Sequence, residues 1–307
     1  RLHGFGFTEF WKTTFDDKFI RQTVIVKVFV LQQNHFKIVL HHNAVIFNTN
    51  GYGDSLQVIH DFVDLPGRSP LYSQLCEAPG GKLYGMTFGG GTYDAGVLYE
   101  YEISSGTYTP KVIFDGAGNG KNPYGSLTLA PNGKMYGMTQ SGGANNLGIL
   151  FEFDPVTETF TKKIDFVSVT QGRNPFGSLI LASNGLLYGL TSAGGANNRG
   201  VLFEYNTATG VLTKKWDFDG TATGRSPYGS LMQASNGNLY GMTFAGGSNN
   251  MGVLFEYNIT TGVLQKKVDF SGAANGSRPY SALTEFSNGL LYGLTTQGGS
   301  AGFGGFI

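Results

Sequence analysis

The sequence has little charge, a single cysteine and no long apolar run. Its 21 Lys and Arg balance 21 Asp and Glu, so the net charge is zero. A nucleic-acid partner is therefore disfavoured, because phosphate binding needs a basic surplus. Cys76 alone excludes an internal disulfide framework and a multi-cysteine zinc site. The longest apolar stretch, residues 23–31, is interrupted by Lys27 and is far shorter than the roughly 20 residues of a membrane-spanning helix.

The chain also lacks the features of an export signal. It begins at Arg1, and no small-residue cleavage site follows the broken apolar stretch. Because the chain ends within its own repeating pattern, we expect it to be a fragment. The sequence therefore leaves open whether a signal peptide precedes it, and it predicts no membrane-spanning segment.

Glycine, by contrast, is in surplus. The chain has 48 glycines in 307 residues, against a usual share of roughly 7%. No Gly-X-Y period is present, so a collagen helix is excluded. Hydrophobic residues at 40% and aromatic residues at 14% supply a core and argue against disorder. The glycines must therefore serve turns or close backbone approaches, many times over.

The main feature of the sequence is a tandem repeat. A Leu/Met-Tyr-Gly tripeptide recurs in steps of 52 residues, with its tyrosine at Tyr84, Tyr136, Tyr188, Tyr240 and Tyr292. A proline keeps the same step at Pro123, Pro175, Pro227 and Pro279. Pro70 lies one residue early, because the first copy carries an extra residue before its tyrosine. Five such units are visible, and they cannot have arisen by chance.

Each unit reads as four antiparallel strands. In the third copy we predict strands at 178–182, 186–191, 200–205 and 211–218, separated by Asn-Gly at 184–185, a Gly-Gly loop and a Thr-Gly turn. Four strands in about 50 residues indicate a propeller blade. The alternative, a β-solenoid, has shorter coils and lacks two tight hairpins per repeat. The fold class predicted is all-β, a β-propeller of four-stranded antiparallel blades with five 52-residue repeats, the last incomplete.

The motif Gly-x-Leu-Tyr-Gly-Met-Thr, followed by Gly-Gly and then Gly-Val-Leu-Phe-Glu-Tyr, resembles the GloVer (Gloeo/Verruco) tandem repeat of bacterial secreted proteins. The resemblance covers residues 54 to about 304. The order of strand, Gly-Gly and strand is also kelch-like, although the regular tryptophan of kelch repeats is missing and only Trp216 occupies a fourth strand. The resemblance implies an exported bacterial protein, extracellular or on the cell surface. It implies no established reaction.

The chain divides into a non-repeating segment, 1–52, and the propeller repeats, 53–307. The first segment is rich in β-forming residues and holds four of the five histidines. It could be an N-terminal strand region, a linker, or sequence translated out of frame and not native or not ordered. No acidic or cysteine partner has ligand spacing near these histidines, so we expect no metal site there.

Two outcomes for the ring are open. Residues 56–62 match the fourth strand of a unit and could complete a five-bladed ring with the last, incomplete repeat. Alternatively, the native ring has more blades than the chain shows. The C-terminal Gly-Gly-Phe-Ile departs from the expected third strand and favours the second outcome.

Strand direction predicts which loops share a face. The loops between the second and third strands and between blades lie together, opposite the tight turns, and long loops on a rigid scaffold often carry binding residues. They hold amide and basic side chains suited to sugar hydroxyls or a protein partner: Asn145, Asn146, Asn197, Asn198, Asn249, Asn250, Arg68, Lys121, Arg173, Arg225 and Arg278. The structural alternative pairs Arg173 or Arg225 with a fourth-strand aspartate, Asp165 or Asp217.

Positions that break the repeat are further candidates. The first copy has Tyr93 and Asp94 where others have Asn-Asn, and Phe88 and Phe244 follow the second strand where other copies have polar residues. Phe88 and Phe244 could stack on a sugar at the end of the central channel, although drift between repeats also explains such changes. The proposed binding residues are thus Phe88, Tyr93, Asp94, Asn145, Asn146, Asn197, Asn198, Phe244, Asn249, Asn250, Arg173 and Arg225.

No catalytic residue is predicted. Glu100, Glu152, Glu204 and Glu256 recur in the third strand, where pairing with fourth-strand lysines is expected, and identical repeats cannot give two carboxylates unlike environments. Asp-Gly loops near 115–120 and 217–220 faintly resemble calcium loops but lack the later ligands, so no cofactor is expected and calcium stays an alternative.

The function predicted is a secreted or cell-surface binding or scaffold module with a carbohydrate or protein ligand on the long-loop face. The alternatives are a propeller-type carbohydrate-active enzyme, either a lyase or a glycoside hydrolase, and a purely structural surface repeat. The sequence argues against the enzyme, because unlike clusters of His, Tyr and carboxylates are missing. Oligomeric state stays open.

Overall fold

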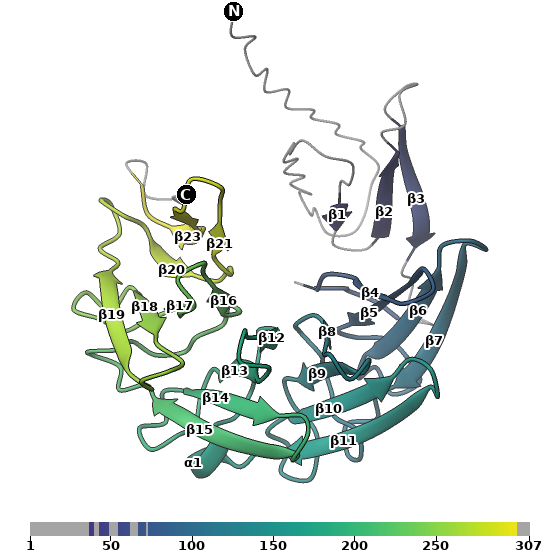
Figure 1. Cartoon of the computed structure of the whole chain (residues 1–307), viewed down its shortest axis with the longest axis horizontal. Helices are drawn as coiled ribbons and strands as arrows, with labels where there is room; N and C mark the ends of the chain where they lie inside the picture. Colours follow the sequence, from purple (N-terminus) through teal and green to yellow (C-terminus); the bar gives the residue numbers. More distant parts are fainter. Residues whose placement is uncertain (1–36, 40–42, 49–54, 62–66, 72, 300–307) are drawn as a thin grey trace, which may run out of the picture.

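The structure is a computed structural model that describes residues 37–39, 43–48, 55–61, 67–71 and 73–299. Figure 1 shows antiparallel sheets following one another around an arc, with the β1–β3 sheet and the β20–β23 strands at its two ends. The short strands β8, β12 and β16 lie on the inside of the arc, and β7, β11, β15 and β19 lie on the outside.

Four complete blades form the middle of the arc. Each is a four-stranded sheet whose strands are paired in sequence order. The strands are β4 Cys76–Ala78, β5 Lys82–Thr87, β6 Val97–Glu102 and β7 Thr107–Ile113; β8 Thr128–Leu129, β9 Met135–Thr139, β10 Ile149–Asp154 and β11 Thr159–Asp165; β12 Ile180–Leu181, β13 Leu187–Thr191, β14 Val201–Asn206 and β15 Val211–Asp217; and β16 Met232–Gln233, β17 Leu239–Thr243, β18 Val253–Tyr257 and β19 Leu264–Asp269. This architecture confirms the predicted β-propeller.

The two ends of the arc are smaller sheets. At one end, β1 Lys37–Val39, β2 Asn43–Asn48 and β3 Ser55–Asp61 form a three-stranded sheet. At the other, β20 Ser277–Pro279 pairs with β23 Thr295–Gln297, and β21 Thr284–Glu285 pairs with β22 Leu291–Tyr292. A single helical turn, α1 Ser168–Gln171, lies between β11 and β12.

The β2–β3 pair carries a repeat feature. Its register shifts between Ala44 and Val45, as the third and fourth strands of a full blade shift between Leu150 and Phe151. The strand predicted at 56–62 is therefore β3, and the predicted boundary at residue 52 lies between β2 and β3. The histidine-rich start of the chain, including the positions weighed as metal ligands, lies mostly outside the described residues.

Glycine permits the tight turns and the close packing within each blade. Gly185, in the Asn-Gly turn between β12 and β13, has φ of 80°, a conformation that suits glycine. Gly189, in the recurring Tyr-Gly, is closely covered, because a Cβ atom there would lie 2.5 Å from the ring of Phe203. The repeated tripeptide therefore reflects ring-on-backbone packing between β13 and β14.

The hydrophobic core lies between blades. One cluster joins Tyr84 and Leu98 of the first blade to Met135 and Phe151 of the second, and the next two clusters join the following blades in the same way. Each blade therefore buries one face against its neighbour, which explains why the sequence repeats its apolar positions so closely. Phe151 and its equivalents Phe203 and Phe255 are fully buried.

A buried polar network recurs in the blades. The Tyr136 hydroxyl donates to Glu152 over 2.6 Å and accepts a bond from the Asn132 amide. Lys134 and Lys163 flank the same carboxylate at 2.8 and 3.6 Å. The expected pairing between third-strand glutamates and fourth-strand lysines is thus confirmed for one lysine of each pair. The other, such as Lys162, instead bridges to Asp165 on its own strand.

The Tyr205 hydroxyl is buried outside this network, and it serves as a comparison for the tyrosine hydroxyls within it. It is buried without a hydrogen-bond partner among the described residues, and burial raises its pKa to about 12. The equivalent residue of the preceding blade is Phe153. We expect Tyr205→Phe to change the free energy of unfolding by less than about 0.5 kcal/mol, or to stabilise the fold, because no hydrogen bond is lost.

Tyr188→Phe is the matched variant. Its hydroxyl donates to Glu204 and accepts from Asn184, at 3.0 and 2.9 Å, so its loss should cost about 1–2 kcal/mol. Urea denaturation of both variants checks the prediction. Equal losses would contradict the assignment of the two hydroxyls.

Candidate functional site

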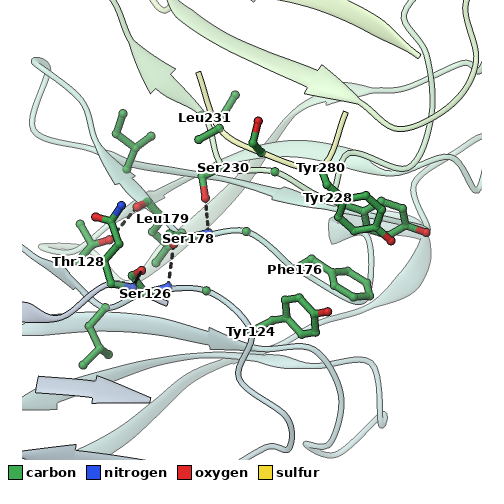
Figure 2. Close-up of a pocket in the computed structure, with 18 of the residues that line it drawn as sticks. Tyr124, Ser126, Thr128, Phe176, Ser178, Leu179, Tyr228, Ser230, Leu231 and Tyr280 are labelled. Atoms are coloured by element: carbon green, nitrogen blue, oxygen red, sulfur yellow. Dashed lines mark hydrogen bonds between the residues drawn. The ribbon is translucent and has the colours of Figure 1, made fainter. Parts of the chain in front are cut away.

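The inner ends of the blades are joined by a ladder of serine hydroxyls. The backbone N–H of Gln74 donates to the Ser126 hydroxyl, that of Ser126 to Ser178, and that of Ser178 to Ser230, over 2.6, 2.7 and 2.8 Å. Figure 2 shows two of these bonds between successive blades. We call Ser126, Ser178 and Ser230 the serine ladder. A hydroxyl that accepts one such bond can still donate its own hydrogen to a ligand.

Glycines let the inner strands approach each other. Gly125, Gly177 and Gly229 precede the ladder serines, and a Cβ atom on Gly177 would lie 2.6 Å from the Gly229 carbonyl oxygen. Thr128 adds a side-chain bond across the same junction by donating to the Leu179 carbonyl over 2.7 Å. Backbone and hydroxyl contacts therefore hold the inner wall together.

Aromatic rings line one end of this wall. Tyr124, Phe176, Tyr228 and Tyr280, here called the aromatic row, come from successive repeats and lie next to one another in Figure 2. Successive ring centroids are 5.0, 4.8 and 4.7 Å apart. The first two contacts are edge-to-face, and the Tyr228 and Tyr280 rings are parallel within 6°. All four side chains are half-buried, so each keeps part of its surface for a ligand.

The row and the ladder line a cavity of about 530 Å³, within the usual range for small-molecule sites. We call it the inner cavity, and its lining is Gln74, 124–129, 176–180, 228–231 and 280–282. None of these lining residues is charged. The wall therefore offers ring faces and neutral hydroxyl and amide groups.

Phe88 and Phe244 contact the aromatic row from outside the lining of the inner cavity. The Phe88 and Tyr124 rings are perpendicular, with centroids 5.4 Å apart. Phe244 contacts Tyr228 and Tyr280 at 5.3 and 5.2 Å. Neither lines the inner cavity. Their placement leaves them candidate binding residues that support the row at its long-loop end.

The paired loop asparagines tie the loops to the blades. Within each pair, the first amide donates to a backbone carbonyl: Asn145 to Phe166, Asn197 to Phe218 and Asn249 to Phe270. The second accepts a backbone N–H: Asn146 from Gly142, Asn198 from Gly194 and Asn250 from Gly246. Each of these bonds uses one donor or acceptor of the side-chain amide, and all six residues are solvent-exposed. They lie in the loops, outside the lining of the inner cavity.

The loop arginines contact these loops and not the strand aspartates. Arg173 donates to Asn198 over 3.3 Å and Arg225 to Asn250 over 2.9 Å. The expected pairing with Asp165 or Asp217 was therefore wrong, because those carboxylates bind Lys162 and Lys214 and backbone N–H groups.

In the first copy, Asp94 takes the place of the second asparagine. It binds the Arg68 guanidinium in a bidentate pair of 2.9 and 2.6 Å and accepts the N–H of Gly90. Hydrogen bonds from Arg68 hold the pKa of the Asp94 carboxyl below its usual range. Tyr93 beside it is 63% exposed and is the most accessible aromatic ring among the predicted binding residues.

Arg278 is one position out of step with the other loop arginines. The bridges Arg173 to Ala193 and Arg225 to Ala245 correspond in the last repeat to Ser277 and Gln297. Arg278 instead matches Asn174 and Ser226, and all three have φ near 55°. This left-handed conformation suits asparagine and costs a residue such as arginine roughly 1 kcal/mol.

Sequence reasoning missed the aromatic row and the serine ladder. A signal is present, because an aromatic residue follows the prolines at 123, 175, 227 and 279, and a serine follows two residues later in three of these copies. Which strand end faces the inside of the arc depends on how the blades stack.

Comparison with known sequences decides the family. The Gloeobacter/Verrucomicrobia repeat matches residues 39–184 and 165–307, so two overlapping stretches account for most of the chain. The chain belongs to this repeat family. The match begins at residue 39, the last residue of β1, and so includes β2 and β3 ahead of the first Leu-Tyr-Gly tripeptide at Tyr84. A comparison with curated proteins gave no match.

Solved structures similar to these repeats are distant in sequence. The extracellular domain of a candidate hybrid two-component system from B. thetaiotaomicron is 16% identical with a TM-score of 0.61, over 91% of this chain and 32% of that one. A candidate 6-phosphogluconolactonase from Bacteroides uniformis is 17% identical, with a TM-score of 0.55 over 83% and 70%. The nidogen/laminin complex gives 11% identity and a TM-score of 0.53, over 83% of each chain.

These likenesses support the fold. The chain spans about a third of the length of the first of these structures, and the low identities carry no activity across. No helix in the described part of the chain is long and apolar enough to cross a membrane. Within the same residues, no group of three or more His, Cys, Asp or Glu side chains is placed to hold a metal ion.

Proposed function

We propose that the protein is an exported bacterial binding module that holds a carbohydrate in the inner cavity. The observation that carries the proposal is the aromatic row, four half-buried rings side by side above an uncharged wall. Binding sites typically combine apolar and aromatic surface with a few placed polar groups. Sugar rings present apolar C–H faces and hydroxyl edges, and this wall offers ring faces beside hydroxyl groups.

Other ring-bearing ligands fit this wall less well. Single-stranded nucleic acid also stacks on aromatic rows, but its binding grooves are basic. The inner cavity lacks charged lining residues, and the net charge of the chain is zero. The same lining gives no carboxylate pair for glycoside hydrolysis, which supports a binding role over the enzymatic alternative. Export is supported by the likeness to an extracellular domain.

The test begins with a glycan array probed with the whole chain, followed by calorimetric titration of the best glycan. Tyr124→Ala and Phe176→Ala each remove one ring of the row, and we expect each to weaken binding about tenfold, a change of about 1.4 kcal/mol. Tyr93→Ala, which removes an exposed ring outside the inner cavity, is the matched control and should bind as the wild type does.

Phe88→Ala and Phe244→Ala should have smaller effects, because these rings contact the row from behind. Loss of binding in Tyr93→Ala but not in Tyr124→Ala would move the site to the loop face. A wild-type chain that binds no glycan, or row variants that bind as tightly as wild type, would refute the proposal.

A further inference from the structure

Arg278 departs from the repeat at the end of the aromatic row. The equivalent residues in the preceding repeats are Asn122, Asn174 and Ser226, and all four share φ near 55°. The amides of Asn122 and Asn174 donate to the carbonyl of the residue after the second strand, Phe88 or Gln140. Arg278 replaces this short local bond with a long cationic side chain, although its backbone conformation disfavours arginine.

The Arg278 side chain lies against the aromatic rings. Its guanidinium carbon is 5.1 Å from the centroid of Phe244, a distance at which a cation is attracted to a ring face. Phe244 contacts Tyr228 and Tyr280, the parallel pair of the row. The Phe244 ring therefore lies between the positive charge of Arg278 and the uncharged lining of the inner cavity.

This charge has no internal counterpart in the described residues. The ion pairs found there engage Arg68 and nine lysines, and none involves Arg278. Arg173 and Arg225, by contrast, donate to loop asparagines. A guanidinium stacked on a ring keeps its N–H groups directed outward in its own plane, where they match two oxygens of an anion.

We infer that Arg278 binds an anionic group, a carboxylate or a sulfate, carried by the carbohydrate that the aromatic row holds. The inference rests on the proposed function and names the ligand class as an acidic glycan. The uncharged wall takes the sugar rings, and Arg278 takes the charged substituent beside Tyr280. An acidic peptide would use the same guanidinium, but the four adjacent rings favour a chain of sugar rings.

The experiment compares three probes with one sugar backbone: a hexuronate oligosaccharide, the neutral oligosaccharide made by reducing its carboxyl groups, and the sulfated derivative of that neutral oligosaccharide. Calorimetric titration is carried out on the whole chain at two salt concentrations. We expect wild type to bind one of the acidic probes at least tenfold more tightly than the neutral one, with a preference that falls as salt rises. The carboxylated and sulfated probes distinguish the two sources of charge.

Two variants test the residue. Arg278→Asn restores the side chain found at positions 122 and 174 and should remove the acidic preference without weakening the neutral probe. Arg278→Lys keeps the charge but not the paired N–H groups and should restore only part of the preference. The matched control is Arg199→Met, which introduces the residue found at position 251 of the next repeat, removes one exposed charge from a long loop and should leave all three affinities unchanged.

The outcomes separate the two proposals. Binding of the neutral probe without any acidic preference, or a preference that survives in Arg278→Asn, overturns the inference and leaves the proposed function standing. A chain that binds no probe and no glycan on the array overturns the proposed function and the inference with it. Thermal unfolding of each variant confirms that an altered affinity does not come from loss of the fold.

Discussion

Gly200→Ala is expected to lower the free energy of unfolding by about 3 kcal/mol or more. Gly200 precedes β14 with φ of 105°, outside the left-handed region that other residues tolerate. A Cβ atom there would clash with the Thr191 carbonyl oxygen and would lie 3.0 Å from Cδ of Pro227. Because one obstacle is backbone and the other a proline ring of the next repeat, no side-chain rotation relieves the contact.

Gly185→Ala is the matched control for backbone conformation. Gly185 also has positive φ, at 80°, but no atom lies within 4 Å of the added methyl group. We expect it to cost about 1–2 kcal/mol, the usual penalty for a left-handed residue. The difference between the two urea denaturation curves measures the clash itself. Equal losses would show that blade stacking tolerates the methyl group and would contradict the packing described for Gly200.

Glu152→Ala is expected to cost about 2–3 kcal/mol. The carboxylate accepts hydrogen bonds from the fully buried Tyr136 hydroxyl and from Lys134. Its removal leaves the tyrosine hydroxyl buried with one partner fewer. Glu158→Ala is the comparison, because the Glu158 side chain is 53% exposed and its largely buried partner Lys111 keeps Glu100 as a second partner. We expect this loss to cost about 1 kcal/mol at most. Urea denaturation at neutral pH measures both.

The same carboxylate predicts acid sensitivity. Burial alone would raise the pKa of Glu152, but hydrogen bonds from Lys134 and Tyr136 and the charge of Lys163 prevail and hold it below its ordinary value. A pKa that is lower in the folded than in the unfolded chain stabilises the fold above the unfolded value, near pH 4. This stability is lost as the pH falls through the folded value.

The equivalent glutamates of two other blades show the same lowering of the pKa. Glu100 and Glu256 also have a lowered pKa, with Tyr84 or Lys267 as hydrogen-bond partners. We therefore expect the urea midpoint of the wild type to drop between about pH 5 and pH 3. Glu152→Gln, which does not titrate, should show a shallower drop. A variant that keeps the full pH dependence of the wild type would show that Glu152 does not contribute to it.

The fold could largely be predicted from the sequence, because the same pattern of strands and turns recurs in each of the four complete blades. The strand predicted at 186–191 is β13 Leu187–Thr191, and that at 211–218 is β15 Val211–Asp217. The short inner strands were predicted too long: 178–182 contains only β12 Ile180–Leu181. Before Ile180 the chain does not pair with β13. Instead the Ser178 N–H donates to the Ser230 hydroxyl of the next blade, a contact that strand periodicity within one repeat does not show.

The candidate site was less readable. Exposure, polarity and departure from the repeat indicated the loop residues, yet the inner cavity is formed by residues that do follow the repeat, such as Tyr124 and Phe176. A recurring aromatic residue looks like core until the stacking of blades is known. Arg278 stands at the position of Ser226 and shares its left-handed backbone conformation, but only the structure shows its side chain against Phe244.

The sequence by itself determined the repeat length, the four strands of each blade, the turns and the family, because hydrophobic alternation and glycine-dependent turns act over short distances along the chain. Only the tertiary structure decided which residues face one another across blades. The serine ladder links residues 52 positions apart, and the aromatic row exists only once successive repeats stand side by side. The inner cavity and the position of Arg278 beside Phe244 are therefore products of stacking, a through-space property that one repeat alone does not encode.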